Sequence, residues 1–174
     1  ENSEVIIEDY SDGWCYVCYD GVYGYAASGY LARTINVTED TPLYYLGKSV
    51  GEAVNGLSSV MTLGIYDVGD MFSMYSEYHD YSVKPYDDSD RIRYISVNKD
   101  NCKICSNTKT GMTFQELALY MNFNSVSPTY DSYSESYVGN AKVEYEGCEY
   151  DICFYFDGDS VYSECYYVTI SEVS

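Results

Sequence analysis

The sequence has few basic residues, a single histidine and no long apolar run. Of its 174 residues, 9 are Lys or Arg and 28 are Asp or Glu, which gives a formal net charge of −19. Nowhere do even three basic residues cluster without acids among them, so the usual nucleic-acid binder is excluded, because its affinity comes from Lys and Arg. No run approaches the ~18 apolar residues of a membrane-spanning helix, so we expect no membrane insertion.

The composition is that of a folded protein rather than a disordered chain. Hydrophobic residues make up 46% of the sequence and aromatic residues 17%, and a chain this rich in apolar side chains can bury a core. The length suits one domain or two small ones. Since the chain begins with Glu1, we expect an export signal to precede it.

Seven cysteines raise the question of a metal site or disulfides, although an odd number cannot form a closed disulfide set. Two pairs have the C-x-x-C spacing of half a zinc site, Cys15/Cys18 and Cys102/Cys105. The first pair lies in a predicted strand, where positions three apart point to opposite faces. A local disulfide or redox pair at Cys102/Cys105 stays an alternative. We expect buried small hydrophobic side chains, with no metal and no cofactor. The seven are Cys15, Cys18, Cys102, Cys105, Cys148, Cys153 and Cys165.

Residues 1–34 predict a β-meander. Strands are expected at 4–9, 13–19 and 22–26, and Asp20-Gly21 is a two-residue hairpin signal. The segment GWCYVCYDGVYGY (13–25), closed by Tyr30-Leu31, resembles the second half of a bacterial SH3 (SH3b) domain. That family reads Gly-Trp, a Val in the next strand, a Gly-containing turn, Gly-aromatic and a closing Tyr-Leu. Its opening strands have no counterpart here, so the resemblance implies a partial domain.

A linker and a second unit follow. Residues 35–43 are polar and acidic and contain Pro42, which indicates a linker. In the remainder, 44–174, two helix starts carry a capping box, Ser49/Glu52 and Thr113/Glu116, each followed by apolar residues at helical spacing. Strands are expected at 91–97, 141–145, 148–156 and 160–170. We therefore predict an α+β fold in which a helix plus antiparallel sheet is duplicated, with repeats at 44–99 and 107–174.

This second unit resembles the family of SmpA-type outer-membrane assembly lipoproteins and the tandem-repeat β-lactamase inhibitory protein. The resemblance rests on the helix start GMTFQEL (111–117) and on the later strands. It implies an exported, non-catalytic domain whose sheet face engages another protein. The paired structural cysteines of some members have no obvious match here.

Several short motifs that suggest catalysis or metal binding have simpler explanations. Residues 47–51 fit both G-x-S-x-G and G-K-S, but the glycine that a phosphate loop needs is replaced by Pro42, and Ser49 is better explained as a helix cap. Every Cys-His or Ser-His scheme depends on His79, the single histidine, which we expect in a polar surface loop. The acidic clusters at 87–90 and 157–159 lack EF-hand spacing and suit turns. With 28 acids, the sequence cannot nominate a glycosidase pair.

Tyrosine is the residue in clearest excess, at 24 of 174. It buries a large area at low entropic cost and keeps a hydroxyl for a partner, although it is also a strong strand former. We expect segments 70–87 and 128–140 to be tyrosine-bearing loops or edge strands exposed for binding. The candidate binding residues are Trp14, Tyr16, Tyr25, Tyr75, Tyr78, Tyr81, Tyr130, Tyr133 and Tyr137.

The sequence therefore predicts a non-enzymatic binding module, extracellular or anchored at a bacterial cell surface. Its expected partners are a protein and, for the N-terminal segment, a cell-wall polymer. The alternative is an inhibitor or regulator of an extracellular enzyme, like the β-lactamase inhibitory protein, which a loop inserting into a cleft would distinguish. A catalytic protein would need a pocket converging on His79 or a cysteine.

Overall fold

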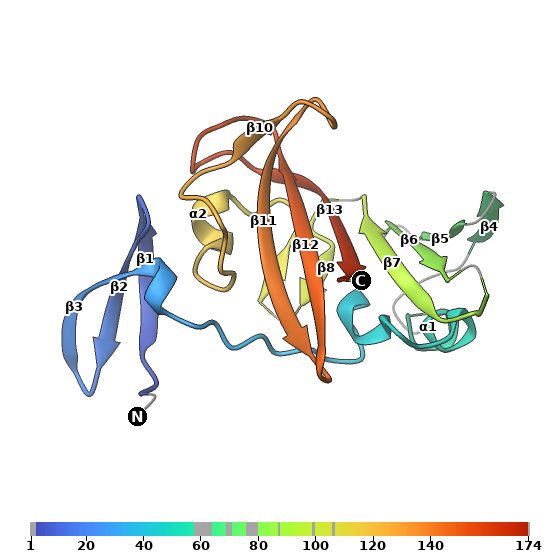
Figure 1. Cartoon of the computed structure of the whole chain (residues 1–174), viewed down its shortest axis with the longest axis horizontal. Helices are drawn as coiled ribbons and strands as arrows, with labels where there is room; N and C mark the ends of the chain where they lie inside the picture. Colours follow the sequence, from blue (N-terminus) through green and yellow to red (C-terminus); the bar gives the residue numbers. More distant parts are fainter. Residues whose placement is uncertain are drawn as a thin grey trace.

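A computed structural model describes residues 3–57, 64–68, 71–75, 80–86, 88–98, 100–105 and 107–173. Among these residues, 48% are in strands and 12% in helices. Figure 1 shows a small N-terminal sheet at one end of the molecule and a large sheet through its centre. His79 and Tyr78 lie outside the described residues, as does the side chain of Tyr75.

The N-terminal sheet is an antiparallel meander in the order β1 (Ile6–Ser11), β2 (Trp14–Tyr19), β3 (Val22–Ala27). Both of its turns pair an Asp with a Gly at positive φ: Asp12 and Gly13 at 49° and 82°, and Asp20 and Gly21 at 48° and 78°. Two consecutive positive φ angles define the hairpin turn that matches strand twist. The strands that we predicted in this segment are confirmed, with bounds shifted by one or two residues.

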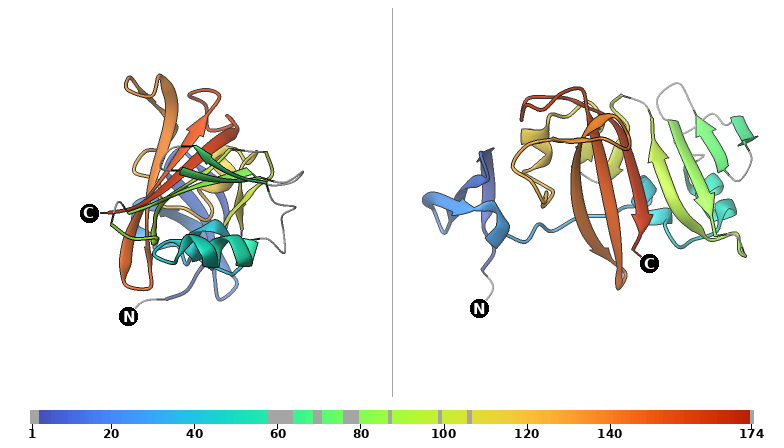
Figure 2. Two further views of the ribbon diagram at one scale, coloured as in Figure 1. Left: turned by 90° about the vertical axis from the view of Figure 1, so that its right-hand side faces the viewer. Right: turned by 45° about the horizontal axis from the view of Figure 1, so that its top comes forward.

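The large sheet has eight strands in the order β10-β11-β12-β13-β7-β6-β5-β4, and every neighbouring pair is antiparallel. Two views in Figure 2 show these strands side by side. A separate two-stranded hairpin, β8 and β9, lies beside them. The bounds are β4 (Gly64–Val68), β5 (Met71–Tyr75), β6 (Asp80–Pro85), β7 (Ile92–Val97), β8 (Lys103–Cys105), β9 (Thr108–Lys109), β10 (Thr129–Asp131), β11 (Ser136–Tyr145), β12 (Cys148–Phe156) and β13 (Cys165–Glu172).

The helical elements are short. They are α1 (Val50–Leu57), α2 (Phe114–Leu117) and the 3₁₀ turns η1 (Ser28–Tyr30) and η2 (Pro42–Tyr45). Both predicted capping boxes are present: the Ser49 hydroxyl accepts from the Glu52 N–H at 3.2 Å and the Glu52 carboxylate accepts from the Ser49 N–H at 2.9 Å. Thr113 and Glu116 make the equivalent pair of bonds.

The predicted α+β fold of duplicated helix plus sheet is wrong, because the described chain is mostly β with two short helices among several antiparallel sheets. The physical reason is that a capping box fixes where a helix begins and not how far it runs. Helix α2 has four residues, and the eight residues of α1 include Gly51 and Gly56, which are poor helix formers.

The core lies on one face of the large sheet. Along β12 the side chains of Tyr150, Ile152, Phe154 and Phe156 are buried, whereas the residues between them are exposed or half-buried. This alternation is the signature of a sheet with one covered face. Helix α2 and the turn after it contribute Phe114, Leu117 and Met121 to the same core. The other face of the sheet, which we call the open face, carries Tyr94, Tyr155, Tyr167 and Ser171.

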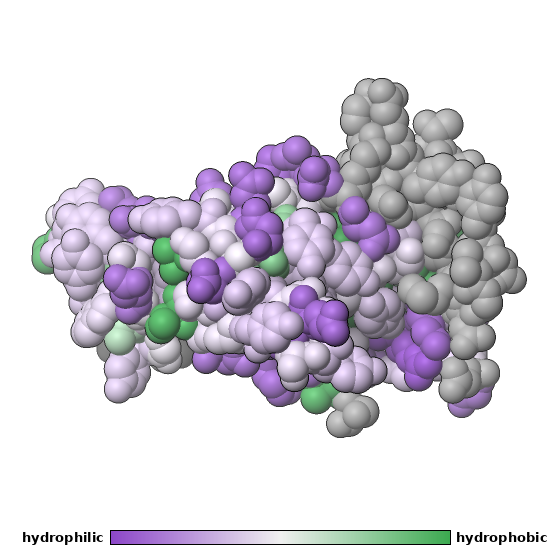
Figure 3. Space-filling model, turned by 90° about the horizontal axis from the view of Figure 1, so that it is seen from above, coloured by the Kyte–Doolittle hydropathy of each residue, from purple (hydrophilic) through white to green (hydrophobic). Residues whose placement is uncertain are grey.

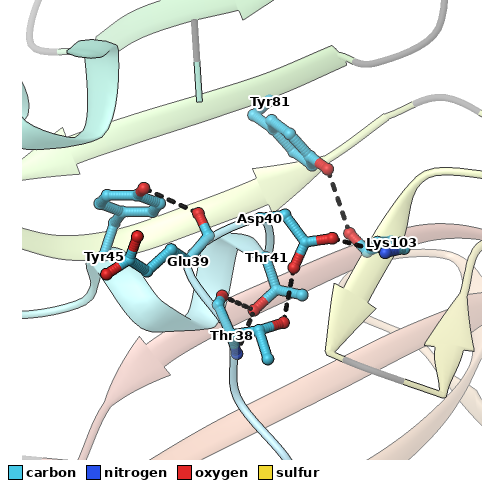
Figure 4. Close-up of polar contacts among 7 residues, drawn as sticks. All are labelled: Thr38, Glu39, Asp40, Thr41, Tyr45, Tyr81 and Lys103. Carbon is cyan, nitrogen blue, oxygen red and sulfur yellow. Dashed lines mark hydrogen bonds and ion pairs between the residues drawn. The ribbon is translucent and has the colours of Figure 1, made fainter. Parts of the chain in front are cut away.

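The segment predicted as a linker connects the two sheets, and its second half is anchored. Figure 1 shows it crossing beneath the ends of β11 and β12. Thr41 is buried, and its hydroxyl donates to the Thr38 carbonyl at 2.7 Å. Asp40 forms an ion pair of 2.6 Å with Lys103, and the Tyr45 hydroxyl donates to the Glu39 carbonyl at 2.7 Å (Figure 4).

Candidate binding surfaces

Four aromatic residues of the N-terminal sheet share one face. Strand register opposes Tyr16 to Tyr25 and Cys18 to Tyr23, and alternate residues of a strand point the same way. Trp14, Tyr16, Tyr23 and Tyr25 therefore lie on one side, and we call this set the aromatic face. Tyr23 is the member that sequence reasoning missed, although its position two residues before Tyr25 in a strand was the available signal.

Three rings of the aromatic face touch one another, and Trp14, Tyr23 and Tyr25 are exposed. Tyr16 stacks on Tyr23 with ring centroids 5.7 Å apart and tilts against Tyr25 at 5.1 Å. Trp14 keeps 53% of its surface exposed and Tyr25 keeps 74%. A side-chain hydrogen bond with Cys18 raises the pKa of Tyr23, so this phenol stays neutral at physiological pH. Seen from above, the end of the molecule formed by β1–β3 has the pale colour of weakly hydrophilic residues such as tyrosine (Figure 3).

The opposite face of the N-terminal sheet belongs to the core. Tyr10 and Cys15 oppose each other across β1 and β2 and are both buried. The Tyr10 ring lies 6.2 Å from that of Phe114, and its hydroxyl donates to the Val126 carbonyl at 3.2 Å. This packing turns the aromatic face outward and holds the small sheet against the region around α2.

Arg33 bonds to both sides of this junction. Its guanidinium donates to the Leu31 and Ala118 carbonyls at 3.0 and 2.9 Å, to the Ser28 carbonyl at 3.0 Å and to the Asn122 side chain at 2.6 Å. A further contact of 3.1 Å reaches the sulfur of Cys15. One guanidinium thus ties β2 and the segment after β3 to the turn that follows α2, which fits the planar fork of five donors that Arg provides.

The predicted tyrosines of segment 128–140 lie on the edge hairpin β10–β11. Tyr130 and Tyr137 oppose each other, and their rings meet edge to face at 5.5 Å. Tyr133 sits in the turn and is 97% exposed. The Asp131 carboxylate accepts hydrogen bonds from Ser134 and Tyr133, which lower its pKa and brace the turn.

Tyr81 is the predicted binding residue that the structure places elsewhere. Its side chain is fully buried on the core face of β6, and its hydroxyl donates to the Lys103 carbonyl at 3.2 Å (Figure 4). Burial raises its pKa. Tyr81 is therefore a core residue and not part of an exposed surface, because the alternation of β6 points it inward next to Val83.

The cysteines form no disulfide, and all seven are described. Cys15 and Cys18 lie on opposite faces of β2, as predicted for residues three apart in a strand. Cys105 is buried beside the Thr108 hydroxyl at 3.0 Å. Within the described part of the chain, no group of three His, Cys, Asp or Glu residues is placed to hold a metal ion. The Asp157 carboxylate accepts from the Glu164 N–H at 3.0 Å, which is a turn contact.

Over the same described residues, no helix has the length and apolar character needed to cross a membrane. Comparison of the chain with protein-family models, with curated proteins and with solved structures found no match.

Proposed function

We propose that this chain is a non-enzymatic binding module of a bacterial cell surface, and that its aromatic face contacts a polymer of the cell wall. The observation that carries the proposal is the shared face of Trp14, Tyr16, Tyr23 and Tyr25, where the ring of Tyr16 contacts those of Tyr23 and Tyr25 and Trp14, Tyr23 and Tyr25 are exposed. Four aromatic side chains on the face that points away from the buried Tyr10 and Cys15 need an explanation beyond core packing.

Charge supports a neutral polymer rather than an anionic one. The molecule carries a net charge of −19, and the three strands of the small sheet contain no Lys or Arg, whereas Glu8, Asp9 and Asp20 lie on them or at their turn. An anionic polymer chain would be repelled by these carboxylates. The C–H faces of neutral sugar rings can stack on tyrosine and tryptophan, whose hydroxyl and N–H groups remain free to bond sugar hydroxyls. The resemblance of this segment to an SH3b domain points in the same direction.

A protein partner is the second part of the proposal, and the β10–β11 turn is the surface that favours it. The turn carries the almost fully exposed Tyr133 on a braced backbone. Figure 1 shows this hairpin projecting from the top of the large sheet. A rigid projecting tyrosine is the kind of anchor that protein interfaces use. It also suits the alternative function, an inhibitor or regulator that inserts a loop into the cleft of an extracellular enzyme.

Cosedimentation with purified cell wall tests the polymer part. We expect Trp14→Ser and Tyr25→Ser each to weaken wall binding about three- to tenfold, because each removes one stacking contact. Tyr162→Ser is the matched control, since Tyr162 is 72% exposed and lies away from the aromatic face, in the β12–β13 connection. Deleting residues 1–34 is unsuitable, because that segment holds the buried Tyr10 and Cys15. Unchanged binding in both variants would refute the assignment.

Capture of exported proteins on the immobilised chain tests the partner part separately. An enzyme retained by the Trp14→Ser protein and lost with Tyr133→Ser would support the inhibitor or regulator function. An enzyme retained equally by both variants would exclude the β10–β11 turn as its contact.

A further inference from the structure

The third strand of the N-terminal sheet is a free edge. On one side β3 pairs with β2, and over the described residues no strand pairs with its other side. Figure 1 and the right-hand view of Figure 2 show β3 as the strand of the small sheet that lies farthest from the large sheet. A further strand can therefore approach β3 without meeting the rest of the molecule.

The backbone groups on this edge follow from the ladder with β2. In an antiparallel pair, alternate residues of a strand bond to the partner strand and the residues between them point away. The Ser28 N–H donates to the Gly13 carbonyl at 2.8 Å, which continues the β2–β3 register by one residue. Counted back by twos from Ser28, positions 26, 24 and 22 bond to β2. The N–H and C=O groups of Tyr23 and Tyr25 therefore point to the open edge.

Strand β3 has none of the features that usually protect an exposed edge. Such edges commonly carry a charge, a proline or a bulge. The strand reads VYGYAA, and its register with β2 is regular. The opposite edge strand of the same sheet, β1, carries Glu8 and Asp9 and has a register shift between Ile7 and Asp9. This contrast identifies β3 as the edge that is open to pairing.

We propose that β3 pairs with β3 of a second copy of this chain, antiparallel and about a two-fold axis at Gly24. The strand is self-complementary in this register, because Tyr23 and Tyr25 flank the axis and each lies opposite the other residue of the second copy. The outward N–H and C=O groups of both tyrosines then bond across the axis. Directly opposed aromatic residues stabilise a strand pair. On the other face, the exposed Val22 lies opposite Ala26 of the second copy.

The pairing joins the aromatic faces of the two copies. Opposed residues of an antiparallel pair point to the same face of a sheet, so the aromatic faces lie on one side of a six-stranded sheet ordered β1-β2-β3-β3-β2-β1. The pairing itself does not depend on the proposed wall contact.

Charge is distributed so that it permits this register, although each copy carries −19. Strand β3 has no charged residue, and the acidic residue nearest to it in the chain is Asp20. Each Asp20 is four residues from the axis, on opposite sides, so at ~3.3 Å per residue the two lie roughly 26 Å apart. This exceeds the Debye length of about 8 Å at physiological ionic strength. Salt should therefore screen the repulsion between the two molecules and strengthen the pairing.

Sedimentation velocity on the full chain tests the pairing in the absence of wall polymer, so its failure is distinguishable from failure of the wall contact. We expect a concentration-dependent equilibrium of monomer and dimer that added KCl shifts towards the dimer. A protein that stays monomeric from micromolar to millimolar concentration in high KCl would overturn the proposal.

Gly24→Lys tests whether β3 forms the interface. A Cβ at Gly24 meets no atom within 4 Å, so the monomer accommodates a side chain there. In the dimer the two lysines oppose each other at the axis, and directly opposed like charges destabilise a strand pair. We expect the dissociation constant of the dimer to rise roughly three- to tenfold. Tyr162→Lys is the matched control, because it adds the same charge at an exposed position in the β12–β13 connection and should not weaken the dimer. Equal dissociation constants in the two variants would place the interface elsewhere.

Gly24→Cys tests the register. Gly24 bonds to β2, so in the dimer the two copies of this residue form a non-hydrogen-bonded pair with Cα atoms about 4.5 Å apart, which is a separation that a disulfide spans. Mild oxidation should link Gly24→Cys into a covalent dimer much faster than it links Tyr162→Cys or the unchanged protein, whose seven cysteines form no disulfide. Near-ultraviolet circular dichroism confirms the fold of each variant. Linkage of Gly24→Cys no faster than that of Tyr162→Cys would refute the two-fold axis at Gly24.

Discussion

Replacement of Arg33 by Met should release the N-terminal sheet from the rest of the molecule. Methionine keeps an unbranched apolar stem but removes every hydrogen bond that the guanidinium donates. Those bonds join β2 and the residues after β3 to Ala118 and Asn122, which lie beyond α2. The substitution therefore acts on the junction and leaves the hairpins of each sheet intact.

The expected loss follows from the acceptors that remain. The Ser28 carbonyl keeps a second donor, the Leu31 N–H at 3.1 Å, so it loses little. The Leu31 and Ala118 carbonyls lose the guanidinium, and a part-buried acceptor left without its donor costs roughly 1–3 kcal/mol. Neighbouring contributions are not additive. We expect the free energy of unfolding to fall by about 3 kcal/mol in total.

Urea denaturation followed by far-ultraviolet circular dichroism measures this loss. Arg91→Met is the control, because Arg91 is exposed and donates to one carbonyl, that of Gly47, at 2.7 Å. It should cost about 1 kcal/mol or less. Hydrogen exchange in β1–β3 should accelerate in Arg33→Met and not in Arg91→Met. An equal, small loss in the two variants would refute the role that we assign to Arg33.

Three further predictions concern packing and pH. Gly56→Ala should destabilise the protein by about 1–3 kcal/mol in urea melts, because a Cβ there would stand 1.8 Å from the buried Tyr45 hydroxyl. Gly51→Ala in the same helix is the control and should stabilise the protein slightly, because no atom lies nearer than 4.0 Å to its Cβ. Hydrogen bonding to Glu172 raises the pKa of Tyr86 to about 12. Because the pKa is higher in the folded state, the stability that protonated Tyr86 contributes is present below pH ~10 and is lost as the pH rises towards 12. Urea midpoints should therefore fall between pH ~10 and 12, while the absorbance of ionised tyrosine at 295 nm grows. Hydrogen bonds from Lys103 and Thr38 lower the pKa of Asp40, so the stability that ionised Asp40 contributes is present above pH ~4 and is lost as the pH falls further. Acid titrations of Lys103→Met should show a smaller loss, because the Thr38 hydrogen bond remains.

Local signals in the sequence predicted local structure well. Asp20 and Gly21 both adopt positive φ in a two-residue turn, which their residue types favour. The capping boxes at Ser49 and Thr113 form as expected. Each of these features depends on residues no more than three positions apart, so no tertiary contact is needed to specify it.

Features that depend on distant contacts were predicted less well. The strand expected at 160–170 begins only at Cys165, because residues 157–164 form a turn braced by Asp157 and Glu164. The strand expected at 91–97 buries both Ile92 and Ile95, which are three positions apart, because a register shift between Lys84 and Pro85 interrupts the alternation. Helix length, and hence fold class, is not specified by the helix starts that the sequence shows.

For the candidate surfaces too, exposure that depends on local alternation was easier to predict than burial that depends on distant contacts. Trp14 and Tyr25, which we predicted as binding residues, are exposed, because alternation within a hairpin places them on the outer face. Tyr81 was expected in an exposed segment and is buried, because the sequence did not show which face of β6 meets the core. Strands β6, β7 and β13 are neighbours in the large sheet, and no short-range pattern in the sequence brings those strands together.

The fluorescence of Trp14 tests the central claim most directly. It is the one tryptophan of the chain, and it lies on the aromatic face with half of its surface exposed. Titration with soluble fragments of neutral wall polysaccharide should shift its emission to shorter wavelength and protect it from acrylamide, with a saturable response that Tyr25→Ser weakens. An emission spectrum that stays constant while the protein still sediments with the wall would show that the polymer binds elsewhere.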